Sequence, residues 1–147
     1  MTVIFFGHRD APEEIRSTLH TVLEQLIEKQ EEILFLIGNR GRFDRMVLYE
    51  VKKMKKKFPW LEYRIVLANI PQNGEMPNEE IQYTIVADGC EECHPRYAII
   101  RCNRWLVQKA DLVITYVSRE FGGAATFQRE AKRKGKRIIN LAEKRDI

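Results

Sequence analysis

Short apolar runs that stop at a glycine constrain the fold of this chain more than any other feature. Residues 3–6 and 33–37 are continuously apolar, and Gly7 and Gly38 follow them directly. Such runs are typical of strands that are buried on both faces of a parallel sheet. Between them, residues 15–27 place apolar side chains at helical spacing. The pattern therefore predicts a strand, a helix and a second strand in succession.

The same alternation continues to the end of the chain. Helices are predicted over 43–58, 96–110 and 123–134, and further strands over 63–68, 112–117 and 137–141. Strands that alternate with helices imply right-handed crossovers and a mostly parallel sheet with helices on both faces. We therefore expect a Rossmann-like three-layer α/β sandwich whose five strands, numbered along the chain, lie in the order 3-2-1-4-5.

The length of 147 residues fits a single domain with one core, spanning 1–147. Residues 69–95 interrupt the periodicity with prolines and glycines, so we expect an irregular insertion there. Only a short strand or helix is expected within it, around 81–86. At the other end, Asp10 stands where it can cap the first helix, with Glu13 three positions later.

Charge and composition favour a cytoplasmic protein without a membrane or nucleic-acid partner. The net charge of +4 comes largely from basic runs at 52–57 and 132–137, which we interpret as solvated helix faces. The alternative is that the protein binds single-stranded nucleic acid through these lysine runs. Such a site would gather basic residues on one surface beside stacking aromatics, and the sequence does not show that gathering. The N-terminus lacks signal-peptide features, and no apolar run approaches the roughly 20 residues of a membrane span. Three cysteines do not suggest a disulfide framework.

Three loops that follow predicted strands share a composition suited to binding an anion. They comprise residues 7–10, 38–42 and 121–126, and in a parallel sheet all three lie at one edge. Glycine allows close backbone approach to a phosphate, and helix N-termini favour negative charge. Guanidinium groups in or beside these loops add charge and bidentate donors, from Arg9, Arg40, Arg42 and Arg119. We expect a pocket for a nucleotide or another phosphorylated nucleoside derivative.

The motifs together resemble those of the small stand-alone bacterial and phage proteins of the SLOG superfamily. The matching residues are Gly7-His8-Arg9, Gly38-x-x-Gly41-x-Phe43-Asp44, Pro95-Arg96-Tyr97-Ala98, Arg101-x-Asn103-Arg104-Trp105, Ala110-Asp111 and Gly122-Gly123-Ala124-Ala125. The superfamily also includes DprA-type DNA-processing proteins and Lonely-guy phosphoribohydrolases. The resemblance implies a Rossmann-like domain that binds nucleotides or nucleotide-derived signals, with enzymatic activity in some branches only. It also implies a homodimer or higher homo-oligomer formed through helices beside the pocket.

The resemblance leaves two functions open, a binding module and an enzyme. The phosphoribohydrolase branch carries Pro-Gly-Gly-x-Gly-Thr-x-x-Glu, in which the glutamate is catalytic. Gly122, Gly123 and Thr126 match that motif, whereas Glu130 stands one residue after the position of the glutamate. One helical step turns a side chain by about 100°. Glu130 is therefore either the catalytic residue of an N-glycosidic hydrolase or transferase acting on nucleoside monophosphates, or a surface carboxylate paired with a nearby basic residue. The binding module would be a sensor, carrier or sequestering protein.

The candidate ligand-binding residues come from the three loops and from the predicted helix 96–110. They are Gly7, His8, Arg9, Gly38, Asn39, Arg40, Gly41, Asp44, Arg101, Asn103, Arg104, Gly122, Gly123, Ala124, Ala125 and Thr126. His8 either bonds the ligand or holds its loop. Asp44 either bonds a ribose hydroxyl or caps its helix. Arg101 and Arg104 are expected to contact phosphate.

A cysteine-rich segment offers a weaker hypothesis of a metal site. Cys90, Cys93 and His94 have the short spacing and ligand types that suit zinc, with Cys102 nearby in sequence. The second thiolate pair usual in zinc ribbons is absent. We therefore interpret these cysteines as surface thiols and predict no certain cofactor other than the nucleotide-like ligand.

Overall fold

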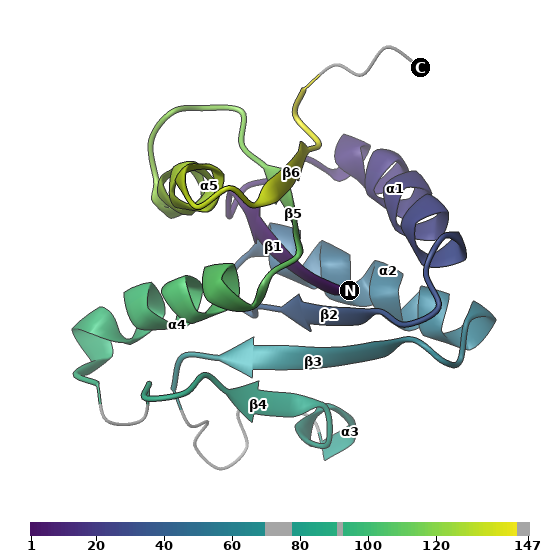
Figure 1. The fold of residues 1–147 in the computed structure, drawn as a ribbon, viewed down its shortest axis with the longest axis horizontal. Helices are drawn as coiled ribbons and strands as arrows, with labels where there is room; N and C mark the ends of the chain where they lie inside the picture. The colour runs from purple at the N-terminus through teal and green to yellow at the C-terminus, as the bar shows by residue number, and fades with distance from the viewer. Residues whose placement is uncertain (70–77, 91–92, 144–147) are drawn as a thin grey trace.

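The computed structural model of the chain describes residues 1–69, 78–90 and 93–143. Its sheet is built from β1 (Thr2–Gly7), β2 (Leu34–Ile37), β3 (Glu62–Leu67), β4 (Thr84–Val86), β5 (Leu112–Tyr116) and β6 (Arg137–Asn140). The strands lie in the order β4-β3-β2-β1-β5-β6, and every neighbouring pair is parallel (Figure 1). The predicted Rossmann-like α/β class is confirmed.

Helices cover both faces of this sheet. They are the short 3-10 helix η1 (Glu13–Ile15), α1 (Arg16–Glu28), α2 (Arg42–Lys57), α3 (Asn78–Ile81), α4 (Pro95–Lys109) and α5 (Gly123–Arg133). The pair α1 and α2 lies on one face, and the pair α4 and α5 lies on the other (Figure 1). Among the described residues, none of the helices combines the length and the apolar character that crossing a membrane demands.

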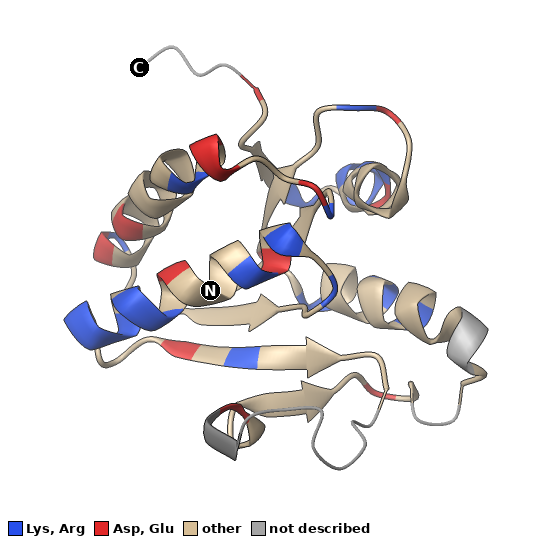
Figure 2. Ribbon diagram, turned by 180° about the vertical axis from the view of Figure 1, so that it is seen from behind, with Lys and Arg blue, Asp and Glu red and all other residues tan. Residues whose placement is uncertain are grey.

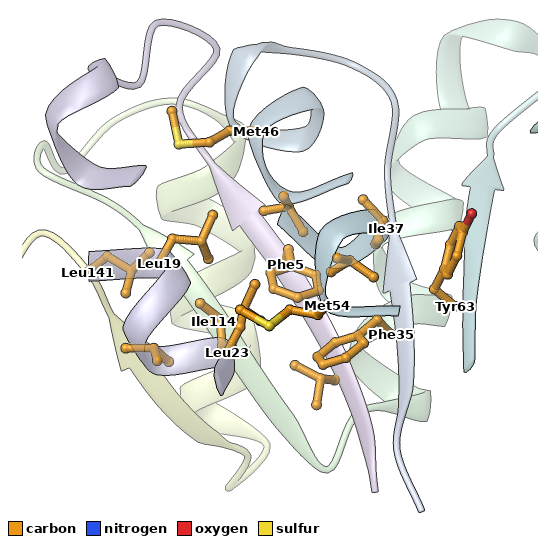
Figure 3. Packing of buried hydrophobic residues seen from close by; sticks show 14 of the residues in the cluster. Phe5, Leu19, Leu23, Phe35, Ile37, Met46, Met54, Tyr63, Ile114 and Leu141 are labelled. Atoms are coloured by element: carbon orange, nitrogen blue, oxygen red, sulfur yellow. The ribbon is translucent and has the colours of Figure 1, made fainter. Parts of the chain in front are cut away.

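Strand β1 shows how a continuous apolar run serves two cores. Successive side chains point to opposite faces of a strand. Val3 and Phe5 accordingly belong to the cluster under α1 and α2, whereas Ile4 and Phe6 belong to the cluster under α4 and α5. Figure 3 shows the first cluster, in which Phe5 lies among side chains from β2, α1 and α2. Burial on both faces explains why the run lacks polar alternation.

The strand order agrees with the prediction for the five expected strands, and β4 adds a sixth at the edge. β4 pairs with β3 through Ile65 and Thr84, and Tyr83 stacks on Tyr63 with ring centroids 4.6 Å apart. β4 spans three partly buried residues, too few to give a periodic signal in the sequence. The described part of 69–95 therefore contributes both α3 and β4 to the domain.

The prediction that Asp10 caps the first helix is wrong. The N-caps of η1 and α1 are Pro12 and Ile15, and neither makes a side-chain capping bond. The carboxylate of Asp10 instead receives two hydrogen bonds from Arg119, which lies 109 residues later in the chain. The carboxylate of Asp10 is thus engaged by Arg119 and does not bond the backbone of the first helix.

Candidate functional site

A cleft of about 310 Å³ opens where the loops after β1, β2 and β5 meet beside α4. All three loops follow the carboxyl ends of parallel strands, and β1 lies between β2 and β5 in the sheet. Such a switch point is where open α/β sheets bind ligands. The cleft is lined by Phe5, Phe6, Gly7, His8, Arg9, Gly38, Arg40, Gly41, Asp44, Ile99, Asn103, Leu106, Arg119, Gly122, Gly123 and Ala124.

The first two loops are packed tightly against each other. A Cβ atom at Gly7 would lie 2.2 Å from the ring of Phe43, a distance that carbon atoms do not tolerate. A Cβ atom at Gly41 would lie 3.0 Å from Arg9, whose carbonyl oxygen accepts a hydrogen bond from the N–H of Arg42 at 3.1 Å. Glycine is therefore needed at position 7 for close approach, and the two loops form one unit.

His8 links the first loop to the third. Its backbone N–H donates to the carbonyl oxygen of Tyr116 at 3.2 Å, and its ring Nε2 accepts from the N–H of Ser118 at 3.1 Å. The residue is buried, with 4% of its surface exposed. Burial, together with the positive charge of Arg119, lowers the pKa of His8. The predicted role of holding the loop is thus present in the structure, and the residue also lines the cleft.

Asp44 does not cap its helix, because the N-cap of α2 is Gly41 and no side chain bonds there. Oδ2 of Asp44 instead accepts a hydrogen bond from the N–H of Arg40 at 2.9 Å, just before the start of α2. Burial raises the pKa of the Asp44 carboxyl, while the Arg40 amide and guanidinium oppose that rise. Because Asp44 also lines the cleft, its carboxyl fixes the second loop at the edge of the site.

Arg40 connects the second loop to α4. Its Nη2 donates to Oδ1 of Asn103 at 2.5 Å, and its Nη1 lies 4.0 Å from Sγ of Cys102. Asn103 is itself buried. The guanidinium is therefore held in place at the cleft by a helix on the opposite face of the sheet from α2.

Arg119 brings a second fixed guanidinium to the cleft. Its two terminal nitrogens donate to the Asp10 carboxylate at 3.0 and 3.2 Å, and its Cζ lies 5.3 Å from the centre of the Phe121 ring. Within the described residues, Nε of Arg119 is buried without a hydrogen-bond partner. The hydrogen bond from Arg119 also lowers the pKa of Asp10, so this carboxylate stays ionised.

The start of α5 leaves its backbone open to the cleft. Gly122 has φ +95° and ψ 170°, a conformation that essentially only glycine adopts. No atom lies within 4 Å of a Cβ built at Gly122 or Gly123. The hydroxyl of Thr126 donates to the carbonyl oxygen of Gly122 at 3.0 Å and so closes the first turn. The N-terminal amides of α5 thus border open space, an arrangement that favours an anion.

Some of the predicted site residues lie outside the cleft. Glu130 pairs with Arg104 at 3.7 Å and with Lys134 at 3.8 Å, which is the alternative to catalysis that the sequence left open. Arg101 packs beside Gly89, and Arg104 is exposed, so neither of these two predicted phosphate contacts lines the cleft. Ala125 is buried and borders a separate shallow groove, and Asn39 and Thr126 are exposed without lining the cleft.

Several lining residues were absent from the predicted site. Phe5 and Phe6 precede the last residue of β1, and Ile99 and Leu106 lie on the same side of α4 as Asn103. The spacing of 99, 103 and 106 is that of one helical face and could have identified them. Arg119 was expected to add charge near the third loop, and the cleft places it among the lining residues.

The cysteines do not lie on the surface as expected. Cys90 and Cys102 are buried, and Cys93 is partly exposed. Burial raises the pKa of the Cys102 thiol. Cys90 packs in the cluster beneath α4, which explains its burial. In the described portion of the chain, no three His, Cys, Asp or Glu side chains are grouped so as to hold a metal ion.

No model of a known protein family matches the chain, and no curated protein matches it significantly. Membership of the SLOG superfamily therefore stays a prediction from the motifs.

Proposed function

We propose that this protein binds a nucleotide or a nucleotide-derived phosphorylated ligand in the cleft, as a sensor, carrier or sequestering protein. The observation that carries the proposal is the meeting of fixed cationic groups with an open helix N-terminus. Arg40 and Arg119 are held by Asn103 and Asp10, and Gly123 begins α5 beside them. Guanidinium groups and helix N-termini are the elements with which proteins bind phosphate.

The other side of the cleft suits a nucleoside. Ile99 and Leu106 of α4 and Phe6 of β1 supply apolar surface, against which a base can pack. Small-molecule pockets typically measure 300–1,000 Å³ and combine apolar walls with a few fixed polar groups. The volume of about 310 Å³ therefore favours one small ligand, of about the size of a nucleoside monophosphate.

The position of Glu130 favours binding over N-glycosidic cleavage. Its carboxylate does not line the cleft, and it pairs with Arg104 of α4 and with Lys134 at the end of α5. A catalytic carboxylate must reach the sugar that it acts on. We therefore assign Glu130 to the contact between helices.

Ion pairing within the protein argues against a nucleic-acid footprint on α2. Figure 2 shows basic residues at the C-terminal end of α2 beside acidic residues of α1. The pairs are Lys52 with Glu80, Lys53 with Glu50, and Lys57 with Glu24, while Lys55 bonds the carbonyl oxygens of Pro59 and Leu61. Lysines that are already neutralised gain less from releasing counterions of a phosphate backbone.

The proposal is tested by calorimetric titration with AMP, adenosine and inorganic phosphate, together with mass spectrometry of any ligand released from purified protein. Gly123→Asp is expected to abolish AMP binding, because it places a carboxylate where the structure leaves open space and a helix N-terminus. Aspartate is well tolerated in the first turn of a helix, so the fold is expected to persist.

Arg104→Ala is the matched control, because Arg104 is exposed and lies outside the cleft. It is expected to bind AMP like the unsubstituted protein. Absence of binding to AMP and to every other nucleotide tried, with no ligand released on denaturation, would contradict the proposal.

A further inference from the structure

The ring of His8 is held between two elements at the end of β1. Tyr116 lies edge-on to it, with ring centroids 5.9 Å apart, and the N–H of Ser118 lies 3.1 Å from Nε2. The residue is almost fully buried yet borders the cleft. Its orientation is thus defined on both sides.

This geometry determines which ring nitrogen carries the proton. A backbone N–H can only donate, so Nε2 must present a lone pair to Ser118. The neutral ring therefore carries its proton on Nδ1. Within the described part of the chain, no protein atom accepts a hydrogen bond from Nδ1. A neutral donor without a protein partner among the described residues is therefore left on a residue that lines the cleft.

We propose that His8 is a specificity-determining residue, whose Nδ1–H donates to a phosphoryl oxygen of the bound ligand. The inference rests on the proposed function. Arg119, whose charge acts on the His8 ring, places the cationic part of the cleft nearby. Nε2 meanwhile holds Ser118, at the start of the loop that carries Arg119 and Gly122. The His8 ring thus donates a hydrogen bond to the phosphate, and it also holds the loop that helps to bind the phosphate.

Two substitutions separate these roles. Gln carries an acceptor near the position of Nε2, so His8→Gln is expected to retain the bond to Ser118 and melt close to the unsubstituted protein. Its affinity for AMP is expected to fall roughly tenfold to a hundredfold, as for losing a hydrogen bond to a charged group. Its affinity for adenosine is expected to stay unchanged, because adenosine has no phosphoryl oxygen. Asn cannot reach Ser118, so His8→Asn is expected to melt at a lower temperature.

The melting temperature of the ligand-free protein, measured as a function of pH, tests the role of His8 without any ligand. The pKa of His8 is lower in the folded protein than in the unfolded chain, where it is 6.5. The stabilisation that His8 gives the fold is therefore fully present above pH 6.5 and is lost as the pH falls below that value. A second proton would have to occupy Nε2 and displace Ser118. The melting temperature of the unsubstituted protein is expected to fall in this range by more than that of His8→Gln.

Nitrogen-15 spectra of the histidine rings complete the test, with the His8 signals assigned by their loss in His8→Gln. At pH 7 we expect a protonated Nδ1 and a bare Nε2, and a shift of Nδ1 on adding AMP but not adenosine. A proton on Nε2, or AMP binding that leaves Nδ1 and the affinity of His8→Gln unchanged, overturns the role of His8 alone. Failure of the unsubstituted protein to bind AMP or any other nucleotide tried, with no ligand released on denaturation, instead overturns the proposed function on which this role rests.

Discussion

Replacing Gly7 by alanine is expected to destabilise the protein through a single contact with Phe43. The new Cβ would lie 2.2 Å from Cγ and Cδ2 of that ring and 2.7 Å from its Cβ. Carbon atoms pack comfortably at roughly 3.5–4.0 Å, so the ring must retreat by more than ~1 Å. Phe43 is only 1% exposed and is surrounded by the larger core, which leaves it little room to move.

Overpacking of this kind typically costs about 1–3 kcal/mol. For a domain of this size, each kcal/mol lowers the melting temperature by roughly 2–4 °C. We expect urea denaturation to show a lower midpoint for Gly7→Ala with an unchanged slope. Phe43→Leu provides a test of the cause, because a smaller side chain should relieve the clash. In a double-mutant cycle, the cost of Gly7→Ala is therefore expected to fall in the Phe43→Leu background.

Gly123→Ala is the matched control, since no atom lies within 4 Å of a Cβ at that position. It is expected to change the free energy of unfolding by no more than about 0.5 kcal/mol. An unchanged midpoint for Gly7→Ala, or an equal loss for both alanine variants, would refute the reasoning from close approach.

Three further predictions concern the supports of the cleft. Burial raises the pKa of Asp44 above 3.8, its value in the unfolded chain. The protonated carboxyl therefore stabilises the fold at low pH, and this stabilisation is lost as the pH rises above 3.8. Asp44→Asn should remove this loss and keep the acceptor for the N–H of Arg40, whereas Asp44→Ala should cost about 1–2 kcal/mol, measured by urea denaturation across pH. Glu130→Gln should leave AMP affinity unchanged in calorimetry, because Glu130 does not line the cleft. A tenfold loss of affinity would show that Glu130 takes part in binding. Asn140→Ala should cost about 1–3 kcal/mol, because the buried amide bonds both the N–H and the carbonyl oxygen of Val117; a melting curve like that of the unsubstituted protein would contradict this.

The layered fold could be predicted because the signals that specify it are local. An apolar run such as 33–37 followed by Gly38 indicates a buried strand without knowledge of its neighbours. Alternation with helices then restricts the sheet to parallel crossovers. β4 lies within the range 81–86 where a short strand or helix was expected, but Thr84–Val86 is too short to show which of the two forms, and only its pairing with β3 places it in the sheet.

The candidate site was predictable at the level of loops and less so at the level of side chains. Glycine loops after parallel strands must meet at one edge, whatever their details. Which helical residue faces that edge depends on rotation by a single position, so Asn103 lines the cleft while Arg104 beside it pairs with Glu130. The partner of Asp10 lies 109 residues away at Arg119, and no local pattern indicates it.

Convergence of the three loops around one anion is tested most directly by nuclear magnetic resonance of the backbone amides during titration with AMP. The amides of Gly7, Gly38 and Gly123, one from each loop, are expected to shift together along a single binding curve. Gly135 is the internal reference, because it lies in the turn before β6, at the ends of the strands opposite the cleft. Its amide signal is expected not to shift. Shifts confined to one loop, or centred on the lysine-rich end of α2, would contradict a shared anion site.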